Sequence, residues 1–431
     1  MSMDIYAVTG SPVGHSFSPQ LFNSAFLKSG LDCVYTRLAA DSAEEALAIV
    51  RKIGLSGMNV TAPFKQSMAG LMDALDPEAE ETGSVNGVVL SGGRAFGFNT
   101  DGRGVVGAFR LNGIALREKR VAVIGAGGAG RAAVSGLMKE AAKVTVLNRT
   151  FSKAERLARK YGCRCEPLGG LSAVIGRSDI VLSVVSAPDP LINLEWLAPG
   201  QVFLDANYRD PRQTEIARER GCRVIDGLDW LVAQAVPAFE YFTGRRIEPA
   251  VLTEALAHRD SPAGRASPIS LVGMMGAGKT TIGTLLASAL GSDLFDTDEA
   301  IENKTGDRIP SIFKRRGEMF FRKMEHQVIR EMGAEPSRRI YALGGGAVTA
   351  ARNRSILKRR SFVIWLWADP GRLLERIPPE GRPLLEGGER QTALAGLMAD
   401  RLADYARASD LIVNANRSPQ DVVRKIRDEV Y

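Results

Sequence analysis

Two glycine-rich turns, each between a short apolar run and a helix-like pattern, constrain the fold most strongly. The first, VAVIGAGGAGRAA, spaces Gly125, Gly127 and Gly130 as GxGxxG, which lets a pyrophosphate approach the backbone at the N-terminus of a helix. The second, GMMGAGKT at 273–280, fits GxxxxGK(S/T), the loop whose backbone amides wrap nucleotide phosphates. Because the two spacings differ, we interpret the turns as two separate nucleotide sites.

Short apolar runs alternate with helix-like spans on both sides of HRDSPAGRASP at 258–268. This alternation predicts βαβ units on parallel sheets, and the stretch at 258–268 has the composition of a linker. A chain of 431 residues is also too long for one hydrophobic core. We therefore predict an α/β fold with separate domains before and after the linker. The apolar runs lie at 121–125, 143–148, 179–185, 201–206, 269–272, 339–345 and 361–368.

The composition excludes several classes of protein. No run of about 18 apolar residues is present, so we expect no membrane-spanning helix and a cytoplasmic location. Four cysteines and three histidines are too few for a disulfide framework or a structural zinc site. The net charge of +7 comes from basic residues scattered without interleaved aromatics, which favours small anionic ligands over nucleic acid. The choice between a monomer and a homodimer stays open.

The residues after the apolar run at 143–148 indicate which dinucleotide the first turn binds. A site selective for NAD usually carries an acidic residue there, which binds the ribose hydroxyls. This chain has Asn148, Arg149 and Thr150, with Lys153 one turn later. Cations and neutral donors suit a 2′-phosphate, so we predict NADP; the alternative is that Arg149 and Lys153 are solvated surface charges. The residues predicted to bind this cofactor are Gly125, Ala126, Gly127, Gly128, Ala129, Gly130, Asn148, Arg149, Thr150 and Lys153.

Further motifs occur in order before the linker. They are GSPVGHSFSPQLFN (10–23), GMNVTAPFK (57–65), SVNG (84–87), GFNTDGRG (97–104), the GAGGAG turn, NRTFSKAERLA (148–158), DANYRDPRQT (205–214) and GLDWLVAQAVPAFEYFTG (227–244). Together they resemble the shikimate dehydrogenase family along its whole length. The resemblance implies a substrate-binding lobe over 1–103 and 236–257, a Rossmann lobe over 104–235, and reduction of 3-dehydroshikimate to shikimate with NADPH.

Two positions depart from that family pattern. Gly87 stands where the family usually has threonine, and SVVSAPDP at 183–190 stands where a longer loop approaches the nicotinamide. The nicotinamide contacts are therefore not carried over residue by residue.

The same resemblance implies a catalytic pair, Lys65 and Asp101. When hydride reaches a carbonyl carbon, negative charge grows on the oxygen, and a nearby ammonium can stabilise that charge and donate a proton. The carboxylate beside it would orient the lysine. The structural alternative is that Lys65 is an exposed charge and Asp101 caps a helix. By resemblance, the residues lining the substrate site are Ser16, Ser18, Asn59, Thr61, Asn86, Asp101 and Gln234.

Motifs after the linker also occur in a recognisable order. They are FDTDEAIENKTG (295–306), IFKRRGEMFFRKME (312–325), LGGGAV (343–348), RPLL (382–385) and RLADYARASD (401–410). With the loop at 273–280 they resemble shikimate kinase, which implies a P-loop domain over 269–431 that transfers phosphate from Mg·ATP to shikimate. In such a loop Lys279 neutralises phosphate charge and the hydroxyl of Thr280 ligates Mg²⁺. The residues predicted to bind the nucleotide are Gly276, Ala277, Gly278, Lys279, Thr280, Thr281 and Arg417.

The kinase resemblance also implies an acceptor site. Two arginines offer forked donors for a carboxylate, and Asp298 can accept the hydroxyl proton and aim the oxygen at phosphorus. Asp296 is predicted to assist the metal, and Arg382 to belong to a lid over ATP. The residues predicted to hold shikimate are Asp298, Arg322, Gly345, Gly346 and Arg401. Structural alternatives stay open, namely pairing of Arg322 with Glu318 or Glu325 along its helix, and capping of a helix near Glu299 by Asp296 and Asp298.

These motifs predict a bifunctional enzyme of the shikimate pathway, in which the product of the first reaction is the substrate of the second. One rival is a regulatory protein that senses pathway metabolites without turning them over. Another is a quinate or shikimate dehydrogenase that uses NAD and is fused to a kinase. The residues whose retention argues against a sensor are Lys65, Asp101, Lys279, Thr280, Asp298 and Arg322. The basic residues after 143–148 argue against NAD.

Overall fold

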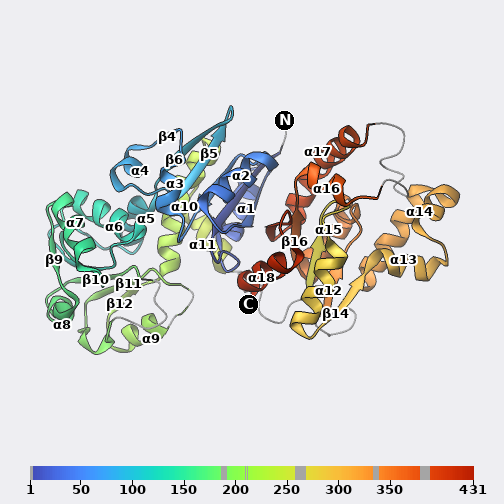
Figure 1. The fold of residues 1–431 in the computed structure, drawn as a ribbon. Coiled ribbons are helices and arrows are strands. Elements are labelled where there is room, and N and C mark those ends of the chain that lie inside the picture. Colours follow the sequence, from blue (N-terminus) through green and yellow to red (C-terminus); the bar gives the residue numbers. More distant parts are fainter. Residues whose placement is uncertain are drawn as a thin grey trace. The chain divides into compact units, whose positions relative to one another are not determined.

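The structure is a computed structural model that describes residues 3–185, 192–208, 210, 212–257, 268–332, 339–378 and 389–431. The chain divides into two compact units, whose helices and strands are labelled in Figure 1. The first comprises residues 1–19, 31–62 and 259–431, and the second comprises 20–30 and 63–258. Among the described residues, no helix has the length and apolar character needed to cross a membrane.

Strands and helices alternate along the first unit. Its strands are β1 (Asp4–Gly10), β2 (Cys33–Ala39), β3 (Gly57–Val60), β13 (Ile269–Val272), β14 (Asp293–Asp296), β15 (Arg339–Ala342), β16 (Phe362–Trp367) and β17 (Leu411–Asn414). Its helices are α2 (Ala43–Ile53), α12 (Lys279–Leu290), α13 (Thr297–Thr305), α14 (Ile309–Glu331), η3 (Ala347–Thr349), α15 (Ala351–Arg360), α16 (Pro370–Arg376), α17 (Arg390–Ala408) and α18 (Pro419–Val430). Helix α1 (Ser18–Lys28) begins in this unit and continues into the second.

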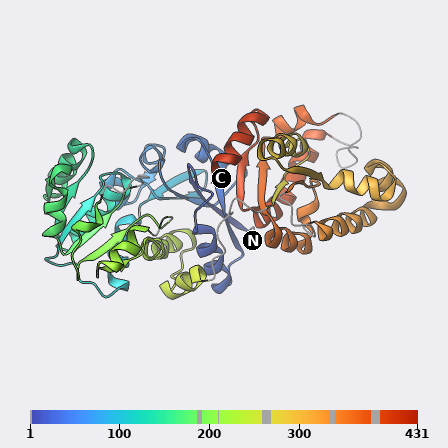
Figure 2. The same ribbon diagram turned by 90° about the horizontal axis from the view of Figure 1, so that it is seen from below.

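The strands of the first unit lie in the order β14-β15-β13-β16-β17-β2-β1-β3, and neighbouring strands in this order run parallel. All six residues of β16, FVIWLW, are buried, as expected for a strand covered on both faces. Between β17 and β2, Ile412 lies opposite Leu38 and Val413 lies opposite Ala39. The N-terminal strands, blue in Figure 2, therefore continue the sheet formed by the C-terminal segment.

Strands and helices also alternate in the second unit. Its strands are β4 (Ala74–Leu75), β5 (Gly87–Ser91), β6 (Arg94–Phe98), β7 (Arg120–Ile124), β8 (Lys143–Leu147), β9 (Arg164–Glu166), β10 (Ile180–Ser183), β11 (Val202–Asp205) and β12 (Arg223–Ile225). Its helices are α3 (Lys65–Ala69), α4 (Pro77–Thr82), α5 (Asp101–Leu111), α6 (Gly128–Lys139), α7 (Phe151–Tyr161), η1 (Leu168–Gly170), α8 (Leu171–Gly176), η2 (Leu194–Trp196), α9 (Arg212–Glu219), α10 (Gly227–Thr243) and α11 (Pro249–Ala257).

Within the described part of the second unit, six parallel strands form a separate sheet in the order β12-β11-β10-β7-β8-β9. The chain order reverses between β7 and β10, and open α/β sheets bind ligands outside the strand ends at such a reversal. Alternate residues of β7, including Val121 and Val123, pack into one core with Ala133 and Leu137 of α6. This core fixes the GxGxxG turn between β7 and α6.

The observed elements confirm the predicted α/β class and its parallel sheets. The apolar run at 121–125 becomes β7 and the run at 143–148 becomes β8, each within one or two residues. The two compact units, however, do not follow the domain boundaries expected from the motifs, because the strands within residues 1–62 group with the C-terminal segment. The expected boundaries stay a prediction, and residues 258–267 of the expected linker lie outside the described residues.

Candidate active sites

The loop at 273–278 forms a backbone cradle between β13 and α12 in the first unit. Gly276 and Gly278 have φ angles of 78° and 86°, a conformation that residues other than glycine rarely adopt. A Cβ at Gly276 would also lie 2.9 Å from the carbonyl oxygen of Leu373. The turn therefore requires glycine, and it ends at the N-terminus of α12, where unpaired amides favour anions.

Lys279 is the first residue of α12 and reaches back over this turn. Its Nζ donates to the backbone carbonyls of Gly273 and Met274 at 3.0 and 3.1 Å. These contacts hold the ammonium beside the cradle, where it can meet phosphate charge.

Thr280 and Asp296 lie side by side next to the cradle. The hydroxyl of Thr280 donates to Oδ2 of Asp296 at 2.8 Å. The other carboxylate oxygen of Asp296 accepts a hydrogen bond from the backbone N–H of Asp298 at 2.9 Å. Asp296 therefore also caps α13, which is the structural role raised as an alternative for it. Hydroxyl and carboxylate oxygens are hard ligands, and Mg²⁺ in phosphate sites takes few protein ligands. The pair therefore fits a magnesium ion bound beside phosphates.

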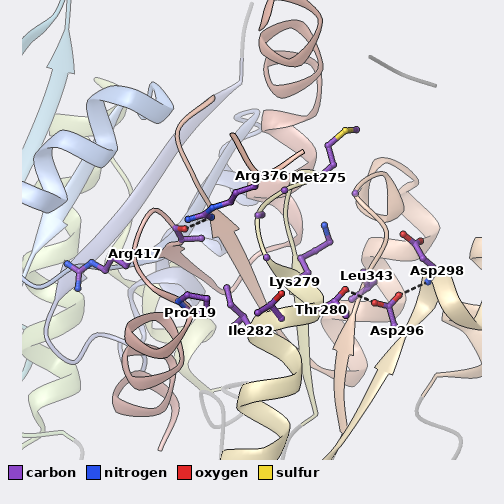
Figure 3. Close-up of a pocket in the computed structure, with 17 residues that line it drawn as sticks. Met275, Lys279, Thr280, Ile282, Asp296, Asp298, Leu343, Arg376, Arg417 and Pro419 are labelled. Atoms are coloured by element: carbon purple, nitrogen blue, oxygen red, sulfur yellow. Dashed lines mark hydrogen bonds between the residues drawn. The ribbon is translucent and has the colours of Figure 1, made fainter. Parts of the chain in front are cut away.

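A cavity of about 430 Å³ includes the cradle (Figure 3). In Figure 3, Lys279 lies in the middle, Arg417 and Pro419 lie on one side, and Asp296 and Asp298 lie on the other. If the phosphates of a nucleotide occupy the cradle, its nucleobase would lie toward Arg417. The molecule that accepts the phosphoryl group would lie toward Asp298. The lining residues are Met275, Gly276, Ala277, Gly278, Lys279, Thr280, Thr281, Ile282, Asp296, Asp298, Ala342, Leu343, Gly345, Arg376, Ala415, Arg417 and Pro419.

The LGGGAV segment lets charged side chains approach the backbone. A Cβ at Gly344 would lie 2.7 Å from Oδ1 of Asp298, and a Cβ at Gly346 would lie 2.4 Å from Nη1 of Arg322. Nη1 of Arg401 donates to the carbonyl of the glycine between them at 3.2 Å. Three charged residues predicted from separate motifs therefore gather at one glycine turn.

Arg322 is also paired along its own helix, α14. Its Nη2 lies 2.9 Å from Glu318, and its Nη1 lies 2.9 Å from Glu325, so the pairing raised as an alternative is present together with the contact at the glycine turn. The Glu325 side chain is 1% exposed, and burial raises its pKa to about 6. Tyr405, which the motifs did not single out, donates its hydroxyl to the carbonyl of Gly345 at 2.6 Å.

Arginines line the nucleotide side of the cavity. Arg376, which sequence reasoning missed, donates to a backbone carbonyl at 2.9 Å. Arg417 pairs with Glu45 at 2.6 Å and also with Asp41, so carboxylates of the N-terminal segment compensate its charge. Arg382 lies outside the described residues and stays a prediction.

Lys65 and Asp101 form an ion pair in the second unit, with Nζ 2.5 Å from Oδ2. The Asp101 side chain is 2% exposed and also accepts a hydrogen bond from Nδ2 of Asn86 at 2.9 Å. Its backbone carbonyl accepts from the indole of Trp230 at 3.1 Å. Because α5 has Thr100 as its N-cap, the cap role raised as an alternative for Asp101 does not fit. The pair is held in place by several hydrogen bonds, as a buried ion pair requires.

The GxGxxG turn lies next to this pair. A Cβ at Gly128 would lie 2.9 Å from the hydroxyl of Ser84 and 3.5 Å from Cβ of Lys65. A Cβ at Gly130 would lie 2.2 Å from the carbonyl oxygen of Gly125, so only glycine lets α6 start this close to β7. A dinucleotide bound at this turn would therefore lie beside the lysine.

Residues after β8 join the same turn. Oδ1 of Asn148 accepts from the backbone N–H of Ala126 at 3.1 Å, and its Nδ2 donates to the carbonyl of Thr150 at 2.9 Å. Arg149 and Lys153 are exposed. A phosphate site and solvated charges would both leave these two side chains exposed, so a cofactor-specificity measurement decides between them.

Gln234 lies on α10 against α5, the helix that begins at Asp101. A Cβ at Gly104 of α5 would lie 2.6 Å from Cβ of Gln234. The close packing of the two helices therefore brings Gln234 to the helix that carries the aspartate.

The other predicted substrate residues lie in the first unit, after β1 and along β3. The hydroxyls of Ser16 and Ser18 are 3.2 Å apart, and Thr61 follows β3 directly. Oδ1 of Asn59 accepts a hydrogen bond from the hydroxyl of Tyr35 at 2.6 Å. Burial raises the pKa of Tyr35, which therefore stays a neutral donor. No motif pointed to this tyrosine, which lies in an apolar strand.

Comparisons with known families match three stretches of the chain. The shikimate dehydrogenase substrate binding domain matches residues 8–88, and shikimate / quinate 5-dehydrogenase matches residues 109–208. Shikimate kinase matches residues 275–431.

Individual relatives agree with these matches. The shikimate dehydrogenase (NADP(+)) of Halobacterium salinarum is 37% identical over 267 residues, which cover 60% of this chain and 100% of that protein. The enzyme of the same name from Pyrococcus abyssi is 35% identical, covering 56% and 93%.

Solved structures of shikimate dehydrogenases are also similar to this chain in fold. The shikimate dehydrogenase of Aquifex aeolicus is similar with a TM-score of 0.56 and 32% identity, covering 60% of this chain and 98% of that one. The Thermus thermophilus enzyme in complex with NADP(H) and shikimate has a TM-score of 0.54 and 32% identity, covering 59% and 98%. The chain therefore belongs to the shikimate dehydrogenase family and carries a shikimate kinase domain in its C-terminal part.

Proposed function

We propose that this chain is a bifunctional enzyme that reduces 3-dehydroshikimate to shikimate with NADPH and then phosphorylates shikimate with Mg·ATP. The observation that carries the proposal is the presence of two assembled sites in one chain. One is the Lys65–Asp101 pair beside the GxGxxG turn. The other is the phosphate cradle whose cavity reaches Asp298.

In the reductase site, Lys65 supplies the proton. NADPH bound at the neighbouring turn would supply hydride to the substrate carbonyl carbon. The ammonium of Lys65 would then stabilise the negative charge on the carbonyl oxygen and donate a proton to it. Asp101 orients the ammonium of Lys65, and Asn86 holds Asp101 in place. We propose that the substrate is held by Ser16, Ser18, Asn59, Thr61, Asn86 and Gln234.

The reductase uses NADP in preference to NAD. Arg149 and Lys153 bring positive charge to the end of β8, where a 2′-phosphate would lie, and no acidic residue stands among residues 148–153 to bind ribose hydroxyls. The turn from Gly125 to Gly130 receives the pyrophosphate.

In the kinase site, Lys279 would bind the phosphates, and Thr280 with Asp296 would hold a magnesium ion. Bound there, Mg²⁺ would neutralise phosphate charge. Asp298 accepts the proton of the attacking hydroxyl, while Arg322 and Arg401 bind the carboxylate of shikimate. Gly345 and Gly346 admit the ring, Arg417 lies on the adenine side, and Arg382 belongs to a lid over ATP.

A spectrophotometric omission series tests the proposal. With 3-dehydroshikimate, NADPH, ATP and Mg²⁺ all present, NADPH absorbance falls and ADP forms. Omitting NADPH abolishes both signals, whereas omitting ATP abolishes only ADP formation. Tight metabolite binding without either signal would instead support the sensor, and higher kcat/KM with NAD than with NADP would support the NAD-dependent alternative.

Three further expectations accompany the function. The substrate lobe comprises residues 1–103 and 236–257, the Rossmann lobe 104–235, the linker 258–268 and the kinase domain 269–431. The enzyme is expected in the cytoplasm, with small-molecule substrates and without nucleic-acid or membrane partners. A homodimer is also proposed, and light scattering on the full chain tests it.

A further inference from the structure

The last helix of the chain, α18, contacts the loop that follows β1. Oε2 of Glu429 accepts hydrogen bonds from the backbone N–H groups of Val13 and Gly14 at 2.5 and 2.9 Å. Glu429 is 6% exposed, so these are charge-assisted bonds within a buried contact. Both partners belong to the first unit, in which β17 and β2 share one sheet.

Lys425, one turn earlier on α18, reaches the same region. Its Nζ lies 3.2 Å from Glu429 and 2.9 Å from Asp41, and it donates to the carbonyl of Ala40 at 2.8 Å and to the hydroxyl of Ser11 at 3.3 Å. An ammonium bound in this way compensates the buried carboxylate. The pair on α18 therefore holds both Ser11 at the start of the loop and the chain after β2.

The backbone of the loop after β1 packs tightly against the backbone of α18. A Cβ at Gly14 would lie 2.0 Å from the carbonyl oxygen of Glu429. The loop and the end of α18 are thus in direct contact, and a shift of α18 would shift the loop.

Arg37 of β2 holds the other end of the same loop. Its Nε and Nη2 donate to the carbonyl of Ser16 at 3.1 and 2.6 Å, and its Nη1 donates to the carbonyl of Asp410 at 3.2 Å. Arg37 is 3% exposed. One buried guanidinium therefore joins the loop to the residue that precedes β17.

We propose that the kinase part of the chain completes the reductase site, with Glu429 as a positioning residue for the loop that presents Ser16 and Ser18. The inference rests on the proposed function, because those serines matter only if they bind the substrate. The shikimate dehydrogenase of Halobacterium salinarum is matched over its full length by 60% of this chain. Residues 8–88 match the shikimate dehydrogenase substrate binding domain and residues 275–431 match shikimate kinase, so the contact joins segments that belong to two families.

Shikimate-dependent reduction of NADP⁺ by the full chain tests the proposal. Glu429→Ala removes both acceptor bonds, so the KM for shikimate should rise by roughly tenfold, the size expected for charge-assisted hydrogen bonds. The KM for NADP⁺ and the kinase activity should stay within about twofold. Glu429→Gln keeps a carbonyl oxygen for the two amides and should restore most of the shikimate affinity.

The exposed neighbour Asp428 supplies the matched control. Asp428→Ala makes the same kind of change on the same helix and should leave every constant unchanged. An unchanged KM for shikimate in Glu429→Ala would overturn the proposal, and so would an equal rise in both reductase KM values with a parallel loss of kinase activity. If Glu429→Ala does not fold, Glu429→Asp, whose shorter side chain withdraws the acceptor oxygen from the two amides, is compared with Asp428→Asn: a raised KM for shikimate alone supports the proposal, and identical constants overturn it. A wild-type chain without shikimate-dependent NADP⁺ reduction would contradict the proposed function itself.

Discussion

The two active sites differ in what holds their charged groups in place. In the reductase site, Asp101 is buried and already bonded to Lys65 and Asn86. In the kinase site, the cradle is made of glycine-rich backbone, and Lys279 donates to the carbonyls of Gly273 and Met274 in its own loop. Hydrogen-bonded side chains thus organise the first site, whereas glycine-rich backbone organises the second. Changes to the two lysines should therefore separate the activities.

The largest effect is expected for Lys65→Ala. Loss of the proton donor should lower reductase kcat by about 10²–10⁴-fold, the usual contribution of general acid catalysis. Phosphorylation of added shikimate should stay unchanged, because the kinase site lies elsewhere in the chain. Steady-state assays of both reactions check this, and a matching loss of kinase activity would contradict separate sites.

Lys279→Ala should impair the kinase reaction and leave the reductase reaction intact. Removing the cation that stabilises phosphate charge should lower kinase kcat by about 10²–10³-fold, while reduction of 3-dehydroshikimate continues at the wild-type rate. Lys304→Ala, a change on an exposed pair with Glu331, is the control. Equal kinase rates for Lys279→Ala and the control would remove the phosphate role of Lys279.

The buried carboxylate of Glu325 should make stability depend on pH. Burial raises its pKa to about 6 from an ordinary value of 4.5, so between pH 4.5 and 6 the folded chain binds more protons than the unfolded chain. Stability from this group is therefore present below pH 4.5 and lost as pH rises to 6, by about 2 kcal/mol. Urea unfolding of wild type and Glu325→Gln at both pH values checks this. The free energy of unfolding of wild type should fall relative to that of Glu325→Gln as the pH rises. A difference in this free energy that does not change with pH would contradict the prediction.

The smallest effect is expected for Arg149→Ala. An exposed cation paired with a 2′-phosphate contributes a charge-assisted hydrogen bond, so the KM for NADPH should rise by roughly tenfold. The KM for NADH, which lacks that phosphate, should hardly change. Equal changes for the two cofactors would show that Arg149 is a solvated charge.

Local sequence signals predicted the parts of both sites that follow from turns and strands. The glycines at 125–130 and 273–278 anticipated the two cradles because close backbone approach needs glycine at fixed spacing. The family resemblance brought Lys65, Asp101 and Asn86 together, and the structure joins those three side chains.

Contacts between residues far apart in the chain had no such signal. The contacts of Arg417 with Glu45 and of Glu429 with Val13 depend on β17 lying beside β2. The sequence of neither strand indicates which strand it pairs with. Tyr405 and Arg376 were missed for a related reason, since a buried tyrosine and a helical arginine look the same whether or not a cavity is near.

A double-label experiment tests most directly whether one chain performs both reactions on the same acid. The full chain is incubated with 3-dehydroshikimate, NADPH deuterated at both C4 positions, and ATP labelled with ¹⁸O in the γ-phosphate, and the products are followed by mass spectrometry. We expect one product, shikimate 3-phosphate, that carries both one deuterium and the labelled phosphate. Deuterium and ¹⁸O on different compounds, or on none, would contradict it.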